Sequence, residues 1–183
     1  MSVLFTIWVI LIVLVLYHHV GYLVILKLFS NEQRKEDKPT VTPTTRFGIL
    51  MCAYNEQAHI KEKLYNLGSM LYDTQYYAIH VYLDGCTDKT YQEAMIAQSH
   101  LAKQNVNCHL HFSKENKGKA FGINELIKLT KPTYDALLFT DVSALLSIDV
   151  LNKIDTDFKN PEVNVITGVY VLDELASAQQ KQY

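Results

Sequence analysis

The sequence predicts an α/β fold, with a mostly parallel sheet flanked by helices, preceded by one transmembrane helix. Strand-like apolar runs alternate with helix-like segments from residue 47 onward, and this order is typical of right-handed crossovers between parallel strands. The Asp-Gly corner at 84–85 is followed by a helical pattern, whereas a hairpin would need a second strand at once. The run from Met1 to Leu26 contains no Asp, Glu, Lys or Arg.

The composition is that of a folded domain with a short appendage. The chain has 183 residues, a formal net charge of −2 and 49% hydrophobic residues. These values argue against a disordered chain and against one that coats nucleic acid. Cys52, Cys86 and Cys108 are scattered without a CxxC pair. We therefore expect neither a metal cluster nor a disulfide framework, and free thiols indicate a reducing compartment.

Residues 1–28 are predicted to form a transmembrane anchor, because about 20 apolar residues span a bilayer as a helix. A cleavable signal peptide would need a basic start and a small-residue cleavage site, and neither is evident. Residues 29–46 are polar, contain proline and lack a helical period, so they are expected to be a linker. Basic residues follow the apolar run and none precedes it. The positive-inside rule then places the domain of residues 47–183 in the cytoplasm, held at the cell membrane.

Five strands and four helices are predicted after the linker. Apolar or alternating residues place the strands at 47–53, 78–84, 107–112, 134–140 and 163–171. Helical spacing places the helices at 56–72, 88–103, 119–130 and 148–158.

Particular residues justify these helices. The apolar face of the first is expected to consist of Ile60, Leu64, Leu67 and Leu71. Asp88 is expected to start the second helix, and Ser147 is expected to cap the last. The segment "ALLF" in the fourth strand is expected to be buried on both faces.

Polar residues follow four of the predicted strands. They are Tyr54, Asn55 and Glu56 after the first, Asp84 after the second, "KENKGK" after the third and Asp141 after the fourth. In parallel sheets the ligand lies beyond the carboxyl ends of the strands. The sequence therefore predicts a site at this edge.

Two of these segments also have an ordinary structural interpretation. "LDGCTDKT" could be a plain turn, or Asp84 could accept hydrogen bonds from a base or ribose hydroxyl, and the residues leave both open. Gly118 and Lys119 in "NKGKA" would suit a phosphate at a helix start, although an isolated segment of this kind is more often a solvated basic turn. It is neither a P-loop nor a dinucleotide fingerprint, so those functions lose support.

Asp141 is the strongest single candidate. It follows a strand expected to be buried, and burying a carboxylate is costly unless it is paired, hydrogen-bonded or bound to a metal. The alternative role, a helix cap, is better filled by Ser147. An oxygen ligand here would suit Mg²⁺ or Mn²⁺ bridging a diphosphate, so the functional interpretation is favoured.

Taken in order, these segments resemble the family-two glycosyltransferases of the GT-A fold, and most closely the membrane-bound group that builds polysaccharides and glycolipids. The matching segments are "ILMCAYNE", "VYLDGCTDKT", "NKGKAFGIN", "LLFTDVSALLSIDVLNKI" and "NPEVNVITG". The resemblance implies a Rossmann-like GT-A domain over 47–183. It also implies transfer, with inversion, from a nucleotide sugar, usually a UDP-sugar, to a glycan or lipid acceptor.

Carried over residue by residue, the resemblance implies a donor site. Tyr54, Glu56 and Asp84 would contact the nucleotide, and Lys119 would lie near it. Asp141 would belong to the Asp-x-Asp motif that holds Mg²⁺ or Mn²⁺ in the family.

The chain departs from the family pattern in three places. Cys86 stands where serine is usual, and Ser143 takes the place of the second acidic residue of the metal motif. The family's downstream acidic base and its Gln/Arg-x-x-Arg-Trp segment have no counterpart. We therefore expect a truncated, donor-binding half with no catalytic base that can be named.

Two functions stay open. The first is a glycosyltransferase anchored in the membrane. The alternative is a non-catalytic membrane module that binds a nucleotide sugar or a partner transferase. A sugar nucleotidyltransferase ranks last, because it would have a glycine-rich, arginine-containing loop where this chain has "CAYNEQAHI".

Overall fold

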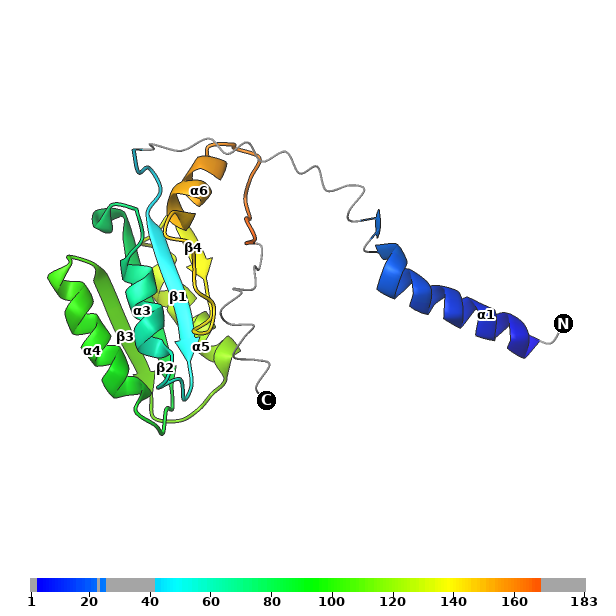
Figure 1. Cartoon of the computed structure of the whole chain (residues 1–183), viewed down its shortest axis with the longest axis horizontal. Helices are drawn as coiled ribbons and strands as arrows, with labels where there is room; N and C mark the ends of the chain where they lie inside the picture. Colours follow the sequence, from blue (N-terminus) through cyan, green and yellow to red (C-terminus); the bar gives the residue numbers. More distant parts are fainter. Residues whose placement is uncertain (1–2, 23, 26–41, 169–183) are drawn as a thin grey trace, which may run out of the picture. The chain divides into compact units, whose positions relative to one another are not determined.

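The structure, a computed structural model, describes residues 3–22, 24–25 and 42–168. The chain divides into two units, Met1–Lys38 and Pro39–Tyr183. The first unit contains helix α1, and the second contains the sheet and the helices that pack on it (Figure 1).

The N-terminal unit differs from the predicted transmembrane helix over 1–28. Helix α1 spans Val3–Leu16, and a five-residue π-helix follows at Tyr17–Gly21. Residues 1–2, 23 and 26–28 of the predicted span lie outside the described residues. Among the described residues, no helix is long and apolar enough to cross a membrane.

The second unit is built on a parallel four-stranded sheet of order β3-β2-β1-β4. Its strands are β1 (Phe47–Ala53), β2 (Tyr77–Asp84), β3 (Asn107–Ser113) and β4 (Ala136–Phe139). The helices are α3 (Ile60–Gly68), α4 (Thr90–Lys103), α5 (Lys119–Thr130) and α6 (Val150–Asp157), with a 3₁₀ turn at Thr74–Tyr76. The predicted parallel α/β fold is confirmed.

Successive side chains along each strand point to opposite faces of the sheet, so the domain has two hydrophobic clusters, one on each face. Ile49 and Val81 point to the face that α3, α4 and α6 cover, in the larger cluster. Leu50 and Tyr82 point to the opposite face, where they meet Leu126 of α5. Figure 1 shows α3 and α4 in front of the sheet and α5 behind it. Because both faces are covered near β1, its carboxyl end is held from both sides.

Two helix predictions need correction. The first helix ends at Gly68, so Leu71 lies beyond it and is 60% exposed rather than part of the buried face. A Cβ at Gly68 would lie 2.1 Å from the Leu101 side chain, which shows how closely α3 approaches α4. Ser147 does not cap α6 with its side chain, because its hydroxyl donates to Asp149.

Helix α4 begins at Thr90, two residues after the predicted start at Asp88, and its N-cap residue is Lys89. Oδ1 of Asp88 accepts the backbone N–H of Thr90 at 2.9 Å, which supplies a partner for one of the free N–H groups at a helix start.

The fourth and fifth predicted strands differ most from expectation. Within the described residues β4 pairs only with β1, and its side chains are half-exposed rather than buried, with Phe139 52% exposed. Residues 163–168 form no strand, while 169–171 lie outside the described residues. Instead, 163–168 line a cavity of about 720 Å³ along β4. An unpaired edge explains why the fourth strand is less buried than its composition suggested.

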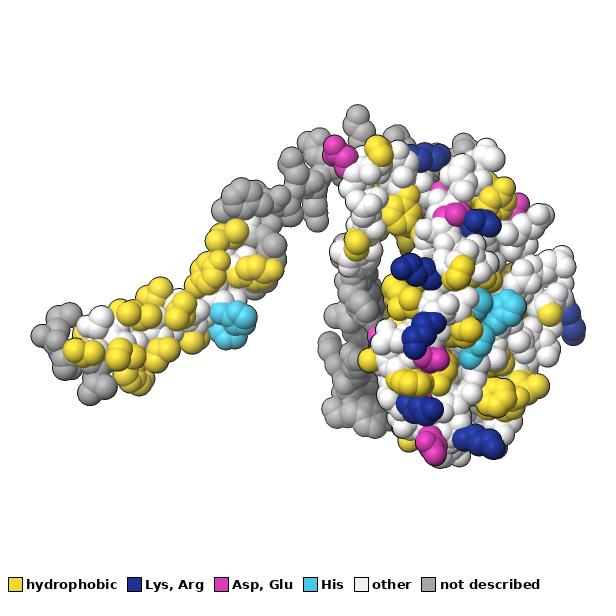
Figure 2. All heavy atoms as spheres, turned by 180° about the vertical axis from the view of Figure 1, so that it is seen from behind, with side chains coloured by type: hydrophobic (Ala, Val, Ile, Leu, Met, Phe, Trp, Pro, Cys, Tyr) yellow, Lys and Arg dark blue, Asp and Glu magenta, His cyan; other side chains and the backbone are white. Residues whose placement is uncertain are grey.

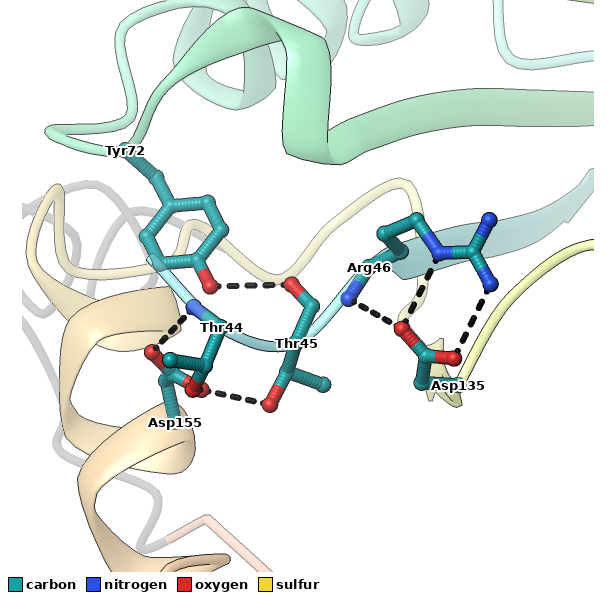
Figure 3. A network of polar contacts seen from close by, with 6 residues as sticks. All are labelled: Thr44, Thr45, Arg46, Tyr72, Asp135 and Asp155. Atoms are coloured by element: carbon teal, nitrogen blue, oxygen red, sulfur yellow. Dashed lines mark hydrogen bonds and ion pairs between the residues drawn. The ribbon is translucent and has the colours of Figure 1, made fainter. Parts of the chain in front are cut away.

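The end of the predicted linker is fixed to the domain, as Figure 3 shows. The carboxylate of Asp155 on α6 accepts the backbone N–H and the hydroxyl of Thr44, at 3.2 and 2.8 Å, and the hydroxyl of Thr45. The hydroxyl of Tyr72 donates to the carbonyl of Thr45 at 2.9 Å. Burial alone would raise the pKa of Asp155, but the hydrogen bonds from Thr45 and Thr44 outweigh it and hold the pKa below its usual value.

The next residue, Arg46, is bonded to the segment just before β4. Arg46 donates its backbone N–H and its guanidinium to the carboxylate of Asp135, at 2.9 to 3.1 Å. This pair sets the start of β1 beside the start of β4 (Figure 3). Thr44, Thr45 and Arg46 of the predicted linker are thus bonded to the domain, while its residues 29–41 lie outside the described residues.

Candidate functional site

The predicted site residues lie together in one pocket. The pocket has a volume of about 360 Å³ and lies at the carboxyl ends of β1, β2 and β4. It is lined by Cys52, Tyr54, Glu56, Asp84, Asn116, Gly118, Lys119, Asp141, Val142 and Ser143. All five residues predicted to bind a nucleotide sugar are in this set, because the parallel sheet brings its strand ends to one edge.

Asp84 organises the loop between β3 and α5. Its side chain is only 1% exposed, and its two oxygens accept the backbone N–H groups of Lys117 at 2.9 Å and Gly118 at 2.7 Å. A buried carboxylate is stable when it accepts hydrogen bonds of this kind. Both oxygens of Asp84 are therefore already engaged by the backbone that leads into α5.

Gly85 is required by the same arrangement. Its φ is +65°, a region that side chains rarely adopt, and a Cβ there would lie 2.3 Å from the backbone nitrogen of Asn116. The Asp-Gly pair is thus a strand-to-helix corner against which the 115–118 loop packs.

The corners after β1 and β2 are joined to each other. Oδ1 of Asn55 accepts the backbone N–H of Thr87 at 2.9 Å, and the backbone N–H of Glu56 donates to Oγ1 of Thr90 at 2.7 Å. Asn55 adopts a φ of +54°, which asparagine tolerates better than most residues. These bonds hold Tyr54 and Glu56 at the rim of the pocket.

Lys119 and Asp141 form an ion pair across the pocket. The two side chains are 61% and 57% exposed, and exposed ion pairs contribute little to stability. Lys119 lies in the first turn of α5, where the helix dipole also favours a negative group. The pair shows that the lysine ammonium can reach the position of a negative charge within this pocket.

Lys63 does not line the pocket but contacts the loop that carries Asp141, and the sequence did not predict this role. It is fully buried on α3, and its ammonium donates to Oγ1 of Thr140 at 2.8 Å and to the carbonyl of Ala144. Burial lowers its pKa to about 8, against the opposing effect of Asp141. A signal was present: Lys63 lies three residues after Ile60, within the apolar stripe of the helix.

Cys52 lies in the pocket but is not a nucleophile at neutral pH. Burial, with a smaller effect of the Asp84 charge, raises the pKa of its thiol to about 11. Cys86 donates weakly to the carbonyl of Ala53 at 3.5 Å.

The pocket leaves at most two carboxylates for a cation. Among the residues that the structure describes, no group of three His, Cys, Asp or Glu side chains could hold a metal. Both oxygens of Asp84 accept backbone N–H groups, which leaves the carboxylates of Glu56 and Asp141 in the pocket, together with Ser143. Mg²⁺ keeps several waters and binds through one or two carboxylates plus substrate phosphates, so this set is sufficient once a diphosphate is present.

None of the three acidic residues of the α6 region lines the pocket. Asp149 accepts from Ser147 and pairs with Lys153, and Asp155 holds the chain entry. Asp157 also lies on α6. The described residues therefore offer no further carboxylate in the pocket besides Glu56, Asp84 and Asp141.

No family model and no curated protein matches the chain. The mannosyltransferase PcManGT from Pyrobaculum calidifontis, solved with GDP-Man and Mn²⁺, has a TM-score of 0.58 at 23% identity, over 68% of this chain and 35% of that chain. TarS from S. aureus has a TM-score of 0.55 at 20% identity, over 62% of this chain and 19% of that chain. TarS 1–349 with UDP-GlcNAc has the same TM-score and identity, over 62% of this chain and 31% of that chain.

These similarities show that the domain has a GT-A glycosyltransferase fold. The chain spans no more than 35% of the length of any of these three structures.

Proposed function

We propose that this chain carries the donor-binding part of a glycosyltransferase, which moves a sugar from a nucleotide sugar to a glycan or lipid acceptor with inversion. We propose a UDP-sugar as the first donor to test. The observation that carries the proposal is the convergence of Tyr54, Glu56, Asp84, Lys119 and Asp141 on one pocket at the carboxyl edge of a parallel sheet. The fold that the chain shares with proteins solved with GDP-Man or UDP-GlcNAc supports this donor class.

Each residue has a role that suits its position. Tyr54 is exposed at the end of β1 and, with Glu56, would contact the nucleoside. Lys119 would lie beside the diphosphate, because it occupies the positive end of α5. Asp84 would act mainly by shaping the 116–118 loop, since both of its oxygens are engaged there.

Asp141 would hold Mg²⁺ or Mn²⁺ together with water and the diphosphate. A bound ion of this kind neutralises charge that develops on a departing diphosphate. Lys119, now paired with Asp141, would then be released to contact a phosphate oxygen. The two side chains would thus exchange one ionic partner for another as the donor enters.

A second candidate is a nucleotide-sugar-binding or partner-binding module without catalysis. The observation that favours it is that, within the described part of the chain, the pocket holds no carboxylate besides Glu56, Asp84 and Asp141. We assign these three to the donor side, so none of them is proposed as the acceptor base. Incubation with labelled UDP-sugars and acceptor extracts separates the two. Transfer to an acceptor excludes the module, and donor binding without transfer or hydrolysis supports it.

Donor binding is tested by titrating the full chain with UDP and with GDP, each with and without Mn²⁺. We expect Asp141→Ala to weaken UDP–Mn²⁺ binding about tenfold or more, with an unchanged melting temperature because Asp141 is exposed. The matched control is Glu125→Ala, which removes an exposed carboxylate paired with Lys128 outside the pocket. Equal affinities for parent and Asp141→Ala would refute the site assignment.

We also propose that residues 1–28 attach the chain to the cell membrane, with the GT-A domain on the cytoplasmic side. The apolar side chains of α1 are exposed on every side of the helix in the N-terminal unit, and a helix that is apolar all round needs an apolar environment. Flotation with phospholipid vesicles, compared with a chain lacking residues 1–28, tests attachment. Equal flotation of both chains would contradict it.

A further inference from the structure

The loop that carries Asp141 is hydrogen-bonded to a buried lysine, Lys63 of helix α3. Lys63 is 0% exposed, and its described partners are Oγ1 of Thr140, at 2.8 Å, and the carbonyl of Ala144. These two partners flank residues 141–143, which all line the donor pocket. One side chain therefore closes the loop at both of its ends.

Burial of this ammonium is costly for the fold. Its hydrogen-bond partners are a hydroxyl and a carbonyl, and no ion pair with a carboxylate is described for it. A buried charge without a paired counter-charge is destabilising. The neighbouring positions of the stripe are Ile60, Leu64 and Leu67, so an apolar side chain would pack here more cheaply.

A second polar residue of α3 continues the same contact one turn further on. The side-chain amide of Asn66 donates to the carbonyl of Leu146, and its Oδ1 accepts the backbone N–H of Leu146, both at 2.9 Å. Two residues of one helix thus bind the 140–146 loop at three points along its length. At its start the loop is also held by the backbone N–H of Thr140, which donates to the carbonyl of Leu50 on β1 at 3.1 Å.

We propose that Lys63 is a positioning residue for donor binding, with Asn66 as its second point of attachment. Together they hold the 140–146 loop so that Asp141 and Ser143 face the pocket before a ligand arrives. A loop fixed in advance loses less conformational entropy on binding. What the pocket binds rests on the proposed function, whereas the contact between α3 and the loop does not.

The test compares Lys63→Met and Asn66→Ala with the parent, using the full chain. Amide hydrogen exchange of residues 141–146 is expected to be about tenfold faster or more in Lys63→Met. UDP–Mn²⁺ binding is expected to weaken about tenfold. The melting temperature is expected to stay equal or rise, because replacing a buried charge by an apolar side chain is often neutral or stabilising. Asn66→Ala is expected to raise exchange chiefly at Leu146.

The control is Leu64→Ala, which removes a fully buried neighbour of Lys63 on the same helix. It should lower the melting temperature and leave UDP affinity within about twofold of the parent. Unchanged exchange in Lys63→Met would overturn the inference, and so would an equal loss of affinity in Leu64→Ala. If the parent binds neither UDP nor GDP, the proposed function fails, while the exchange measurement still decides the role of Lys63.

Discussion

Tyr72 and Tyr77 are both buried, but only one of them has a partner for its hydroxyl. The Tyr72 hydroxyl donates to the carbonyl of Thr45 at 2.9 Å. Within the described part of the chain, the Tyr77 hydroxyl is the one buried side-chain polar atom without a partner, and burial raises its pKa to about 12. Both rings thus contribute apolar packing, but the hydroxyl of Tyr72 is hydrogen-bonded whereas that of Tyr77 is buried without a partner.

We therefore expect Tyr77→Phe to leave the free energy of unfolding unchanged or to raise it by about 1 kcal/mol. Tyr72→Phe should lower it by about 1–3 kcal/mol, because the Thr45 carbonyl loses its donor. Urea unfolding of the two variants beside the parent measures both values. Equal destabilisation by the two substitutions would contradict the difference in hydrogen bonding.

The candidate site was predictable from the sequence because its side chains follow strand ends. Tyr54, Glu56 and Asp84 needed only the strand assignment and the rule that parallel strands end at one edge. Lys63 was missed because the long side chain of a lysine in an apolar stripe usually lets its ammonium group reach water. Its partners lie 77 and 81 residues away, and nothing local in the sequence identifies them.

At the scale of elements, α6 covers the sheet and also binds the residues just before β1. Its Asp155 is the acceptor for the side chains of both Thr44 and Thr45, across 111 and 110 residues of sequence (Figure 3). This contact couples the last described helix to the residues just before β1. Loss of the carboxylate would leave a backbone N–H and two hydroxyls without their acceptor.

Asp155→Ala is expected to lower the free energy of unfolding by about 2–4 kcal/mol. The control is Asp149→Ala at the N-cap of the same helix, whose exposed pair with Lys153 should be worth about 1 kcal/mol or less. Thermal or urea unfolding gives both values. A smaller effect at Asp155 than at Asp149 would show that the entry segment is held by other contacts.

Element types were predicted more reliably than their ends. The strands and helices from β1 to α6 agree with the periodicity of the sequence, whereas the first helix ends three residues before Leu71. That end depends on Gly68 meeting Leu101 of α4, a tertiary contact. The fourth strand was expected to be buried on both faces from its apolar composition, but among the described residues it pairs only with β1, and residues 163–168 form no strand.

At the scale of the whole domain, the sheet face opposite α3 and α4 carries a group of histidines. Figure 2, seen from behind, shows histidine side chains gathered on this surface. His80 stacks on His109 and His111, with ring centroids 4.8 and 5.7 Å apart, and its Nε2 lies 2.9 Å from the hydroxyl of Tyr134. Burial, followed by the charges of His109 and His111, lowers the pKa of His80 to about 4.

This shift predicts a loss of stability in mild acid. The folded-state pKa of His80 lies below the ordinary value of 6.5, so the unfolded chain binds more protons between about pH 4 and 6.5, and stability falls as pH is lowered through that window. The contribution is at most about 3 kcal/mol, since one pKa unit corresponds to about 1.4 kcal/mol.

Unfolding measured at pH 7.5 and pH 5 should show this loss in the parent and a smaller loss in His80→Phe. The comparison uses the difference between the two pH values, so any change in stability from the lost Tyr134 contact cancels. An identical pH dependence in both chains would assign the effect to other groups.

The strand order β3-β2-β1-β4 also determines when the pocket can exist during synthesis. A chain emerging from the ribosome can pair β1 with β2 and then β2 with β3 as each appears, because these neighbours are close in sequence. β4 must instead return to the free side of β1 after three helices and two strands have been made. Asp141 follows β4, so among the described strands the pocket is complete only after β4 has paired with β1. A ligand of this pocket would therefore meet it after the β1–β2 and β2–β3 pairings and could not guide them.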